Sequence, residues 1–131
     1  DEARHAEAVS QLLRYLAGEL KEFWVDLDLR GTSFQRSVWA VARAIPYGGT
    51  LSYREVAARA GRPRATRAVG QAMGANPLPL FIPCHRVVCA DGRPGGFGWG
   101  QEWKLFLLEL EKNGRGGAEK ALRFTRPPSD T

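Results

Sequence analysis

The feature that most constrains the fold is a pair of short helical segments separated by Gly61-Arg62-Pro63, which favours a tight turn. The first segment begins with Ser52-Tyr53-Arg54-Glu55, where serine and glutamate have the spacing of a capping box. The second covers about residues 64–74. Two short helices joined by a glycine-containing turn are typical of a helix-turn-helix, so we predict that motif at the centre of the fold.

The first 30 residues indicate one helix and one extended stretch. Residues 3–17 carry apolar side chains at helical spacing, and Gly18 should end that helix. The buried face is expected to consist of Val9, Leu12, Leu13 and Leu16. Apolar residues then recur at every second position from Phe23 to Leu29, which predicts a short strand.

Two further helices complete the predicted core. One begins at a second capping box, Thr32-Ser33-Phe34-Gln35, and is ended by Pro46-Tyr47-Gly48-Gly49. Its apolar stripe consists of Phe34, Val38, Val41, Ala42 and Ile45. The last helix covers about residues 101–113 and stops at Gly114. Its buried side chains should be Trp103, Phe106, Leu107 and Leu110.

The segment before the last helix is predicted to be extended. It runs from Asn76-Pro77 to Cys89 and meets a hairpin turn at Ala90-Asp91-Gly92-Arg93, which would form the wing of a winged helix. Residues 94–100 are rich in glycine and read as a loop that approaches another group closely. The pattern therefore predicts an α+β, mainly helical chain with a winged helix-turn-helix, followed by a flexible tail over residues 115–131.

Positive charge is concentrated around the helix-turn-helix. The formal net charge is +5, but the stretch from Arg54 to Arg86 holds six arginines against one acidic residue, Glu55. Such a patch fits a polyanion such as nucleic acid. On charge alone, a solvated basic surface is an equally good explanation.

The two cysteines, Cys84 and Cys89, are five residues apart in one extended segment, so a disulfide between them is unfavourable. No secretory signal, membrane-spanning run or lipidation signal is visible, which predicts a reducing, intracellular setting in the cytoplasm and nucleoid, or the nucleus of a eukaryote. Two histidines and two cysteines lack zinc-site spacing. We therefore expect no metal, no cofactor and no membrane partner.

Cys84 and His85 form the chemically most suggestive pair. A free thiol has a pKa of about 8.5 and needs a base to become a nucleophile at neutral pH. Neighbours on a strand point to opposite faces, so a bridging water is one way to connect them. Glu109 and Glu111 are both candidates for the carboxylate that would orient the imidazole. In isolation, such a pair is more often a structural cysteine beside a surface histidine.

The surrounding string resembles the O6-alkylguanine-DNA alkyltransferase family. The match covers about residues 9–112 and is strongest in Ile82-Pro83-Cys84-His85-Arg86-Val87-Val88. The other matching strings are Gly31-Thr32-x-Phe34-Gln35-x-x-Val38-Trp39, Ile45-Pro46-Tyr47-Gly48, Ser52-Tyr53, Arg67-Ala68-Val69-Gly70-Gln71-Ala72-Met73-Gly74-Ala75-Asn76-Pro77 and Lys104…Leu107-Leu108…Glu111. The resemblance implies DNA repair by direct damage reversal: irreversible, stoichiometric transfer of an alkyl group from O6-alkylguanine, and from O4-alkylthymine, to Cys84.

The resemblance also implies individual roles at the site. Cys84 takes the alkyl group, His85 acts as base through a water, and Glu111 rather than Glu109 supports His85. Asn76 orients the turn before the active segment and hydrogen-bonds near the thiol. Tyr53 donates a hydrogen bond to guanine as it becomes the leaving group, which helps the transition state more than the ground state.

The same resemblance implies that a monomer binds the minor groove of double-stranded DNA, largely independently of sequence. Arg67 would fill the stack after the target base flips out, because its reacting atom is unreachable inside a duplex. The implied DNA contacts are Ser52, Tyr53, Ala65, Arg67, Ala68 and Gly70. The implied base pocket is Met73, Val87, Gly95, Phe97 and Trp99. Trp99 stands where a small residue is expected, and Arg86 should buttress the site.

Members of the family usually have a longer N-terminal α/β domain. We therefore divide the chain into an abbreviated N-terminal segment (residues 1–30), the winged-helix alkyl-transfer domain (31–114) and the tail (115–131).

Three alternative functions remain. A lesion-binding relative without transfer would lack Cys84, and a winged-helix regulator would leave Pro-Cys-His-Arg-Val unexplained. A cysteine hydrolase would need an oxyanion hole and would turn over repeatedly.

Overall fold

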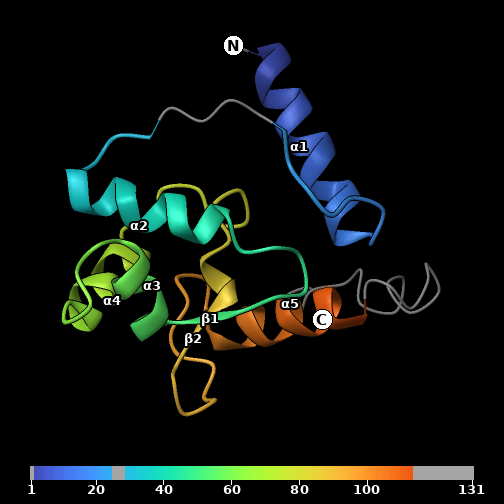
Figure 1. The fold of residues 1–131 in the computed structure, drawn as a ribbon. Coiled ribbons are helices and arrows are strands. Elements are labelled where there is room, and N and C mark those ends of the chain that lie inside the picture. Colours follow the sequence, from blue (N-terminus) through green and yellow to red (C-terminus); the bar gives the residue numbers. More distant parts are fainter. Residues whose placement is uncertain (1, 25–28, 114–131) are drawn as a thin grey trace.

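A computed structural model describes residues 2–24 and 29–113 of the chain (Figure 1). Helices dominate these residues, and the two strands are short, as the α+β, mainly helical prediction requires. The elements in chain order are α1 (Glu2–Leu16), α2 (Ser33–Arg43), β1 (Leu51–Ser52), α3 (Tyr53–Arg59), α4 (Thr66–Gly74), the 3-10 helix η1 (Cys84–Arg86), β2 (Val87–Val88) and α5 (Gln101–Asn113).

The predicted helix-turn-helix is formed by α3 and α4. The Ser52 hydroxyl accepts a hydrogen bond from the backbone of Glu55, and the Glu55 carboxylate accepts one from the backbone of Ser52, so the capping box is complete. Gly61 has φ +86° in the turn, a left-handed conformation that glycine adopts at little cost. Helix α4 begins at Thr66, two residues later than about residue 64, after an alanine that has no side chain to cap it.

One core cluster joins α2, α3 and α4. The second capping box, at Thr32 and Gln35, starts α2 as predicted. Trp39, outside the predicted stripe, is nevertheless buried in this cluster, where its indole Nε1 donates a hydrogen bond to the carbonyl of Ala72 on α4. This cluster packs α4 against α2 and leaves the opposite side of α4 exposed.

A second core cluster brings α1 against α5, on the other side of the molecule from α3 and α4 (Figure 1). Here the predicted face of α1 is partly wrong. Val9 and Leu13 are 43% and 62% exposed, whereas Gln11 and Tyr15 are fully buried. The helix is turned so that these polar side chains find partners, since the Gln11 side chain accepts from the backbone of Trp24 and the Tyr15 hydroxyl donates to Glu111. Leu12 and Leu16 pack against the cluster as predicted.

The segment around Cys84 differs from the extended strand that was predicted. Cys84–Arg86 forms a single 3-10 turn, and the following strand β2 pairs in parallel with β1, with Leu51 opposite Val87. The turn at Ala90–Arg93 does form, with Gly92 at φ +94° and the backbone of Cys89 donating to Arg93. No returning strand follows, because Pro94 lacks a backbone N–H and the glycines after it favour irregular structure.

Some expectations fall outside the described residues. The centre of the predicted strand, residues 25–28, lies there, and its described flanks are irregular. The predicted helix stop at Gly114 and the tail over residues 115–131 also lie there. Within the described ranges, none of the helices combines the length and apolar character needed to cross a bilayer.

Candidate active site

The 3-10 turn η1 places Cys84 on the wall of a cavity of about 400 Å³ between α4 and the glycine-rich loop. The thiol-bearing residue is almost completely buried. The residues that line this cavity are Tyr53, Gly70, Met73, Gly74, Cys84, Gly96, Phe97 and Gly98. Four of these are glycines, so much of the wall is backbone, and a flat ring can approach it closely.

Of the residues predicted to form the base pocket, Met73 and Phe97 line this cavity, whereas Val87, Gly95 and Trp99 lie outside its lining. Val87 is fully buried beneath the site, within the α2–α4 core cluster. Gly95 has φ +80° and lies against Tyr53, where an added Cβ would come within 2.9 Å of the hydroxyl. Trp99 is 43% exposed and packs edge-on against Phe97, with ring centroids 5.6 Å apart, so it supports the wall from outside.

His85 and Glu111 form a buried pair. Their Nε2 and Oε2 atoms are 2.7 Å apart, whereas Glu109 is exposed and accepts a hydrogen bond from Asn113. The geometry thus selects Glu111 from the two candidate carboxylates. An ionised carboxylate can only accept, so the His85 proton is assigned to Nε2. The buried Nδ1 atom has no hydrogen-bond partner among the described residues and is left as an acceptor.

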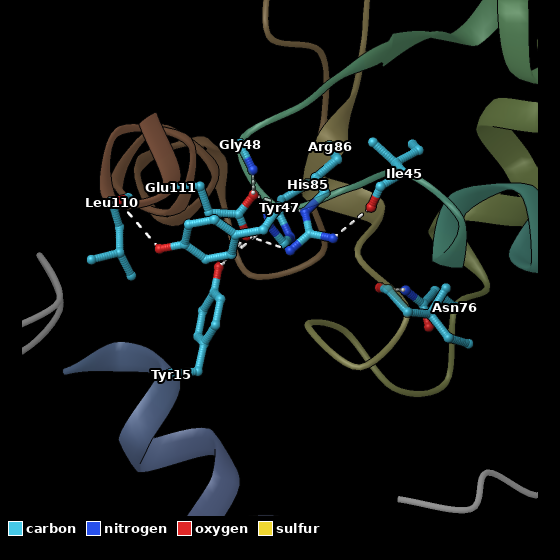
Figure 2. Close-up of polar contacts among 10 residues, drawn as sticks. Tyr15, Ile45, Tyr47, Gly48, Asn76, His85, Arg86, Leu110 and Glu111 are labelled. Carbon is cyan, nitrogen blue, oxygen red and sulfur yellow. Dashed lines mark hydrogen bonds and ion pairs between the residues drawn. The ribbon is translucent and has the colours of Figure 1, made fainter. Parts of the chain in front are cut away.

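Glu111 is held ionised by several donors (Figure 2). Burial alone would raise its pKa, but hydrogen bonds and charge from His85 and Arg86 bring that pKa down to about 2. The backbone of Gly48 and the hydroxyl of Tyr15 donate to the same carboxylate at 3.3 and 2.5 Å. Burial also lowers the pKa of His85, more than its contact with Glu111 raises it, so the imidazole is neutral at pH 7.

The guanidinium of Arg86 donates its hydrogen bonds within this buried network. Its Nε and Nη2 atoms donate to the two oxygens of Glu111 at 2.8 and 2.9 Å, and Nη1 donates to the carbonyl of Ile45. It buttresses the site, as the sequence suggested, but does not belong to the basic surface. The exposed arginines of that surface are Arg54, Arg59, Arg62, Arg64 and Arg67.

Asn76 pins the segment that leads to Cys84. Its side chain donates to the carbonyl of Ile82 at 2.9 Å and accepts from the backbone of Leu78 at 2.8 Å. Burial raises the pKa of the Cys84 thiol, and a hydrogen bond from Asn76 and the charge of Lys104 only partly offset that rise. The thiol is therefore protonated at neutral pH and needs a base to react.

Two polar residues received no role from the sequence. Lys104 is fully buried, and its Nζ atom donates to the carbonyls of Val87 and Gly96 at 2.6 and 3.1 Å. It also lies 5.6 Å from the centre of the Tyr53 ring, so it ties β2, the glycine-rich loop and Tyr53 together. The sequence signal that could have identified Lys104 is its position among the apolar residues of α5. Tyr15, the second residue, lies on α1, and only the fold brings it to Glu111.

The exposed face of α4 continues directly from the cavity. A neighbouring hollow of about 570 Å³ shares Tyr53 and Gly70 with it and is also lined by Arg67 and Cys89. Arg67 and Gly70 are exposed, Ala65 and Ala68 are half-buried, and no atom lies within 4 Å of a Cβ placed on Gly70. Ser52 lies at the start of α3, where its hydroxyl oxygen serves the capping box. Of the six implied contacts, Arg67, Ala68 and Gly70 lie on α4, Ala65 is its N-cap residue, and Tyr53 lies on the cavity rim.

Within residues 2–24 and 29–113, no three His, Cys, Asp or Glu side chains are grouped closely enough to hold a metal ion. Both cysteines are free thiols. A third hollow, of about 290 Å³, is lined by Lys21, Arg43 and Arg86, among others, but by neither Cys84 nor Tyr53, so it is separate from the thiol pocket.

Comparison with known proteins agrees with this geometry. The family model described as 6-O-methylguanine DNA methyltransferase, DNA binding domain, matches residues 33–113. A methylated-DNA–protein-cysteine methyltransferase of Mycobacterium leprae is 56% identical over 108 residues, which are 82% of this chain and 66% of that protein. This chain thus spans about two thirds of that relative's length.

Two solved structures are informative. The crystal structure of Mycobacterium tuberculosis OGT in complex with DNA has a TM-score of 0.81 and 53% identity, and the match covers 88% of this chain and 70% of that one. The S. pombe Atl1 structure, in complex with damaged DNA containing O6-carboxymethylguanine, has a TM-score of 0.56 and 31% identity. That match covers 63% of this chain and 79% of the other.

Proposed function

Because this chain belongs to the methylated-DNA–protein-cysteine methyltransferases, DNA-repair proteins that take an alkyl group from DNA onto a cysteine, we propose that Cys84 is the accepting residue here. The observation that carries the proposal is the position of Cys84. Its buried thiol lines a cavity beside the exposed side of α4. The next residue is a neutral histidine whose Nδ1 atom has no hydrogen-bond partner in the described part of the chain. The proposed domain for this reaction is residues 31–114, with residues 1–30 as a separate N-terminal segment.

The proposed reaction is a single displacement. A water relays the Cys84 thiol proton to His85 Nδ1, and Glu111 stabilises the imidazolium that results. The thiolate then attacks the alkyl carbon of O6-alkylguanine, so that a carbon–sulfur bond forms while the carbon–O6 bond breaks. The bonding electrons leave with guanine, and the hydroxyl of Tyr53 stabilises the charge that develops there. The thioether is stable, so each molecule reacts once. O4-alkylthymine presents the same kind of carbon–oxygen bond.

We propose that the partner is double-stranded DNA, bound by a monomer through the minor groove with little dependence on sequence. The small residues Ala65, Ala68 and Gly70 support a close approach of α4 to the duplex. Arg67 is exposed beside the cavity and is proposed to occupy the stack when the damaged nucleotide flips out. Phosphate contacts from the neighbouring arginines carry no sequence information, which suits a search for damage at any position.

The decisive experiment is to incubate the protein with a duplex that carries one O6-methylguanine and to weigh the intact protein. We expect one methyl group on Cys84 at one equivalent of duplex, and none in Cys84→Ser. Tight lesion binding without a gain in mass would instead support a binding-only protein.

A further inference from the structure

The hydroxyl of Tyr15 reaches the site from an element that the proposed reaction does not use. Tyr15 lies on α1, 96 residues before Glu111 in the chain, and is fully buried. Its oxygen is 2.5 Å from Glu111 Oε2 and 3.5 Å from His85 Nε2. Figure 2 shows the ring pointing from α1 toward the Glu111 carboxylate on α5. The contact is therefore made with the residue that orients the proposed base.

Tyr15 and His85 donate to the same oxygen. Glu111 Oε2 receives the Tyr15 hydroxyl, the Nε2–H of His85 at 2.7 Å and Arg86 Nη2 at 2.9 Å. A carboxylate oxygen offers about two lone-pair sites, so three donors on one oxygen compete for them and each is held less tightly. The Tyr15 hydroxyl should thus reduce the stabilisation that Glu111 gives to a protonated His85, while it holds the carboxylate in place.

The surroundings of Tyr15 make it a fixed donor. Its ring packs against Phe23 and edge-on against Tyr47, with centroids 5.3 and 6.1 Å away. Burial and the charge of Glu111 raise the pKa of Tyr15 well above its usual value, so the phenol keeps its proton at neutral pH. The titratable and charged groups that face Tyr15 or His85 are Tyr47 on the loop before β1, Arg86 on η1, and Lys104 and Glu111 on α5.

We propose that Tyr15 is a positioning residue for alkyl transfer: its hydroxyl fixes the Glu111 carboxylate and limits how tightly that carboxylate binds the Nε2–H of His85. The proposal rests on the proposed function, and it assigns Tyr15 no contact with Cys84 or with the damaged base. It makes α1 part of the working site, because the helix delivers the one hydroxyl that competes with His85 for this oxygen among the described residues.

The test uses the fact that the chain holds two histidines, His5 and His85. Ring nitrogens of 15N-histidine-labelled protein can be titrated by NMR, and His5→Gln identifies the His85 signals. In Tyr15→Phe we expect the pKa of His85 to rise by about one unit, the scale of a lost hydrogen bond to a charged group. The acidic limb of the single-turnover transfer rate should move to higher pH by the same amount.

Tyr47→Phe is the matched control. Tyr47 packs edge-on against Tyr15, but its hydroxyl lies 3.5 Å from the carbonyl of Leu110 and makes no direct bond to Glu111. It should leave the His85 titration and the acidic limb where they are. Equal His85 pKa values and equal acidic limbs in the two variants would overturn the proposal.

A second substitution keeps the test decisive if Tyr15→Phe does not fold. Site-specific 3-fluorotyrosine at position 15 retains the ring and hydroxyl but is a stronger donor, so the pKa of His85 should fall instead of rise. No movement with that residue also overturns the proposal. If the wild-type protein transfers no alkyl group, the proposed function fails, whereas the NMR titration still decides whether Tyr15 governs His85.

Discussion

At the residue scale, the chemistry of the site depends on one carboxylate that is crowded with donors. Glu111 accepts hydrogen bonds from Tyr15, Gly48, His85 and Arg86, and it is almost completely buried. Removing a partner from such a buried charge is destabilising, most of all when the partner is an opposite charge. The same carboxylate thus orients the proposed base and neutralises Arg86.

Replacing this carboxylate by an amide should therefore affect both rate and stability. In Glu111→Gln the proposed base loses the charge that stabilises its protonated form, and we expect alkyl transfer to slow on the order of a hundredfold. Arg86 would also remain buried without a counter-charge, which lowers the free energy of unfolding. Glu109→Gln is the control, because Glu109 is exposed on the same helix. Similar slowing of transfer in both variants would contradict the role of Glu111.

At the element scale, α4 combines a buried side that belongs to the core with an exposed side that borders the cavity. Arg67→Ala should weaken binding to duplex DNA and slow repair of a duplex substrate, because a flipped base is no longer replaced in the stack. Transfer from free O6-methylguanine base needs no flipping and should keep its rate. Rates with the two substrates separate these effects, and an equal loss with both would place Arg67 in the chemical step. Arg36→Ala, an exposed arginine on α2, should change neither rate.

The elements that the sequence predicts best are those whose start signals are local. The capping boxes at Thr32 and Ser52 and the turn at Gly61 act within a few residues, and all three are present as predicted. The face of α1, by contrast, depends on Glu111, far away in the chain. The parallel pairing of β1 with β2 and the 3-10 turn at Cys84 likewise depend on non-local packing, which periodicity does not encode.

The residues of the candidate site also differ in whether local sequence or distant contacts reveal their roles. Cys84 and His85 could be predicted because they are adjacent, but their spacing left Glu109 and Glu111 as equal choices. The family resemblance favours Glu111, and the packing of α5 against η1 directs Glu111 inward and Glu109 to solvent. The sequence assigned no role to Lys104 or Tyr15, because their contacts are made with elements distant in the chain.

At the scale of the whole molecule, the buried network should make stability depend on pH. The pKa of Glu111 falls from 4.5 to about 2 on folding, so its contribution is present above pH 4.5 and is lost as pH falls toward 2. The pKa of His85 is lowered from 6.5, so below that value the unfolded chain takes up a proton that the folded chain resists. Both groups make the unfolded state bind more protons in acid, and stability should therefore decrease as pH falls below about 6.5.

Urea denaturation between pH 7 and pH 2.5 measures this loss. The shift at Glu111 corresponds to about 3 kcal/mol, most of it lost between pH 4.5 and the acidic end of the series. Glu111→Gln cannot titrate at that position, so its unfolding free energy should start lower at pH 7 and decline less steeply below pH 4.5. Parallel declines in the two proteins would show that other carboxylates govern acid unfolding, and that the network around Glu111 is not what couples folding to protons.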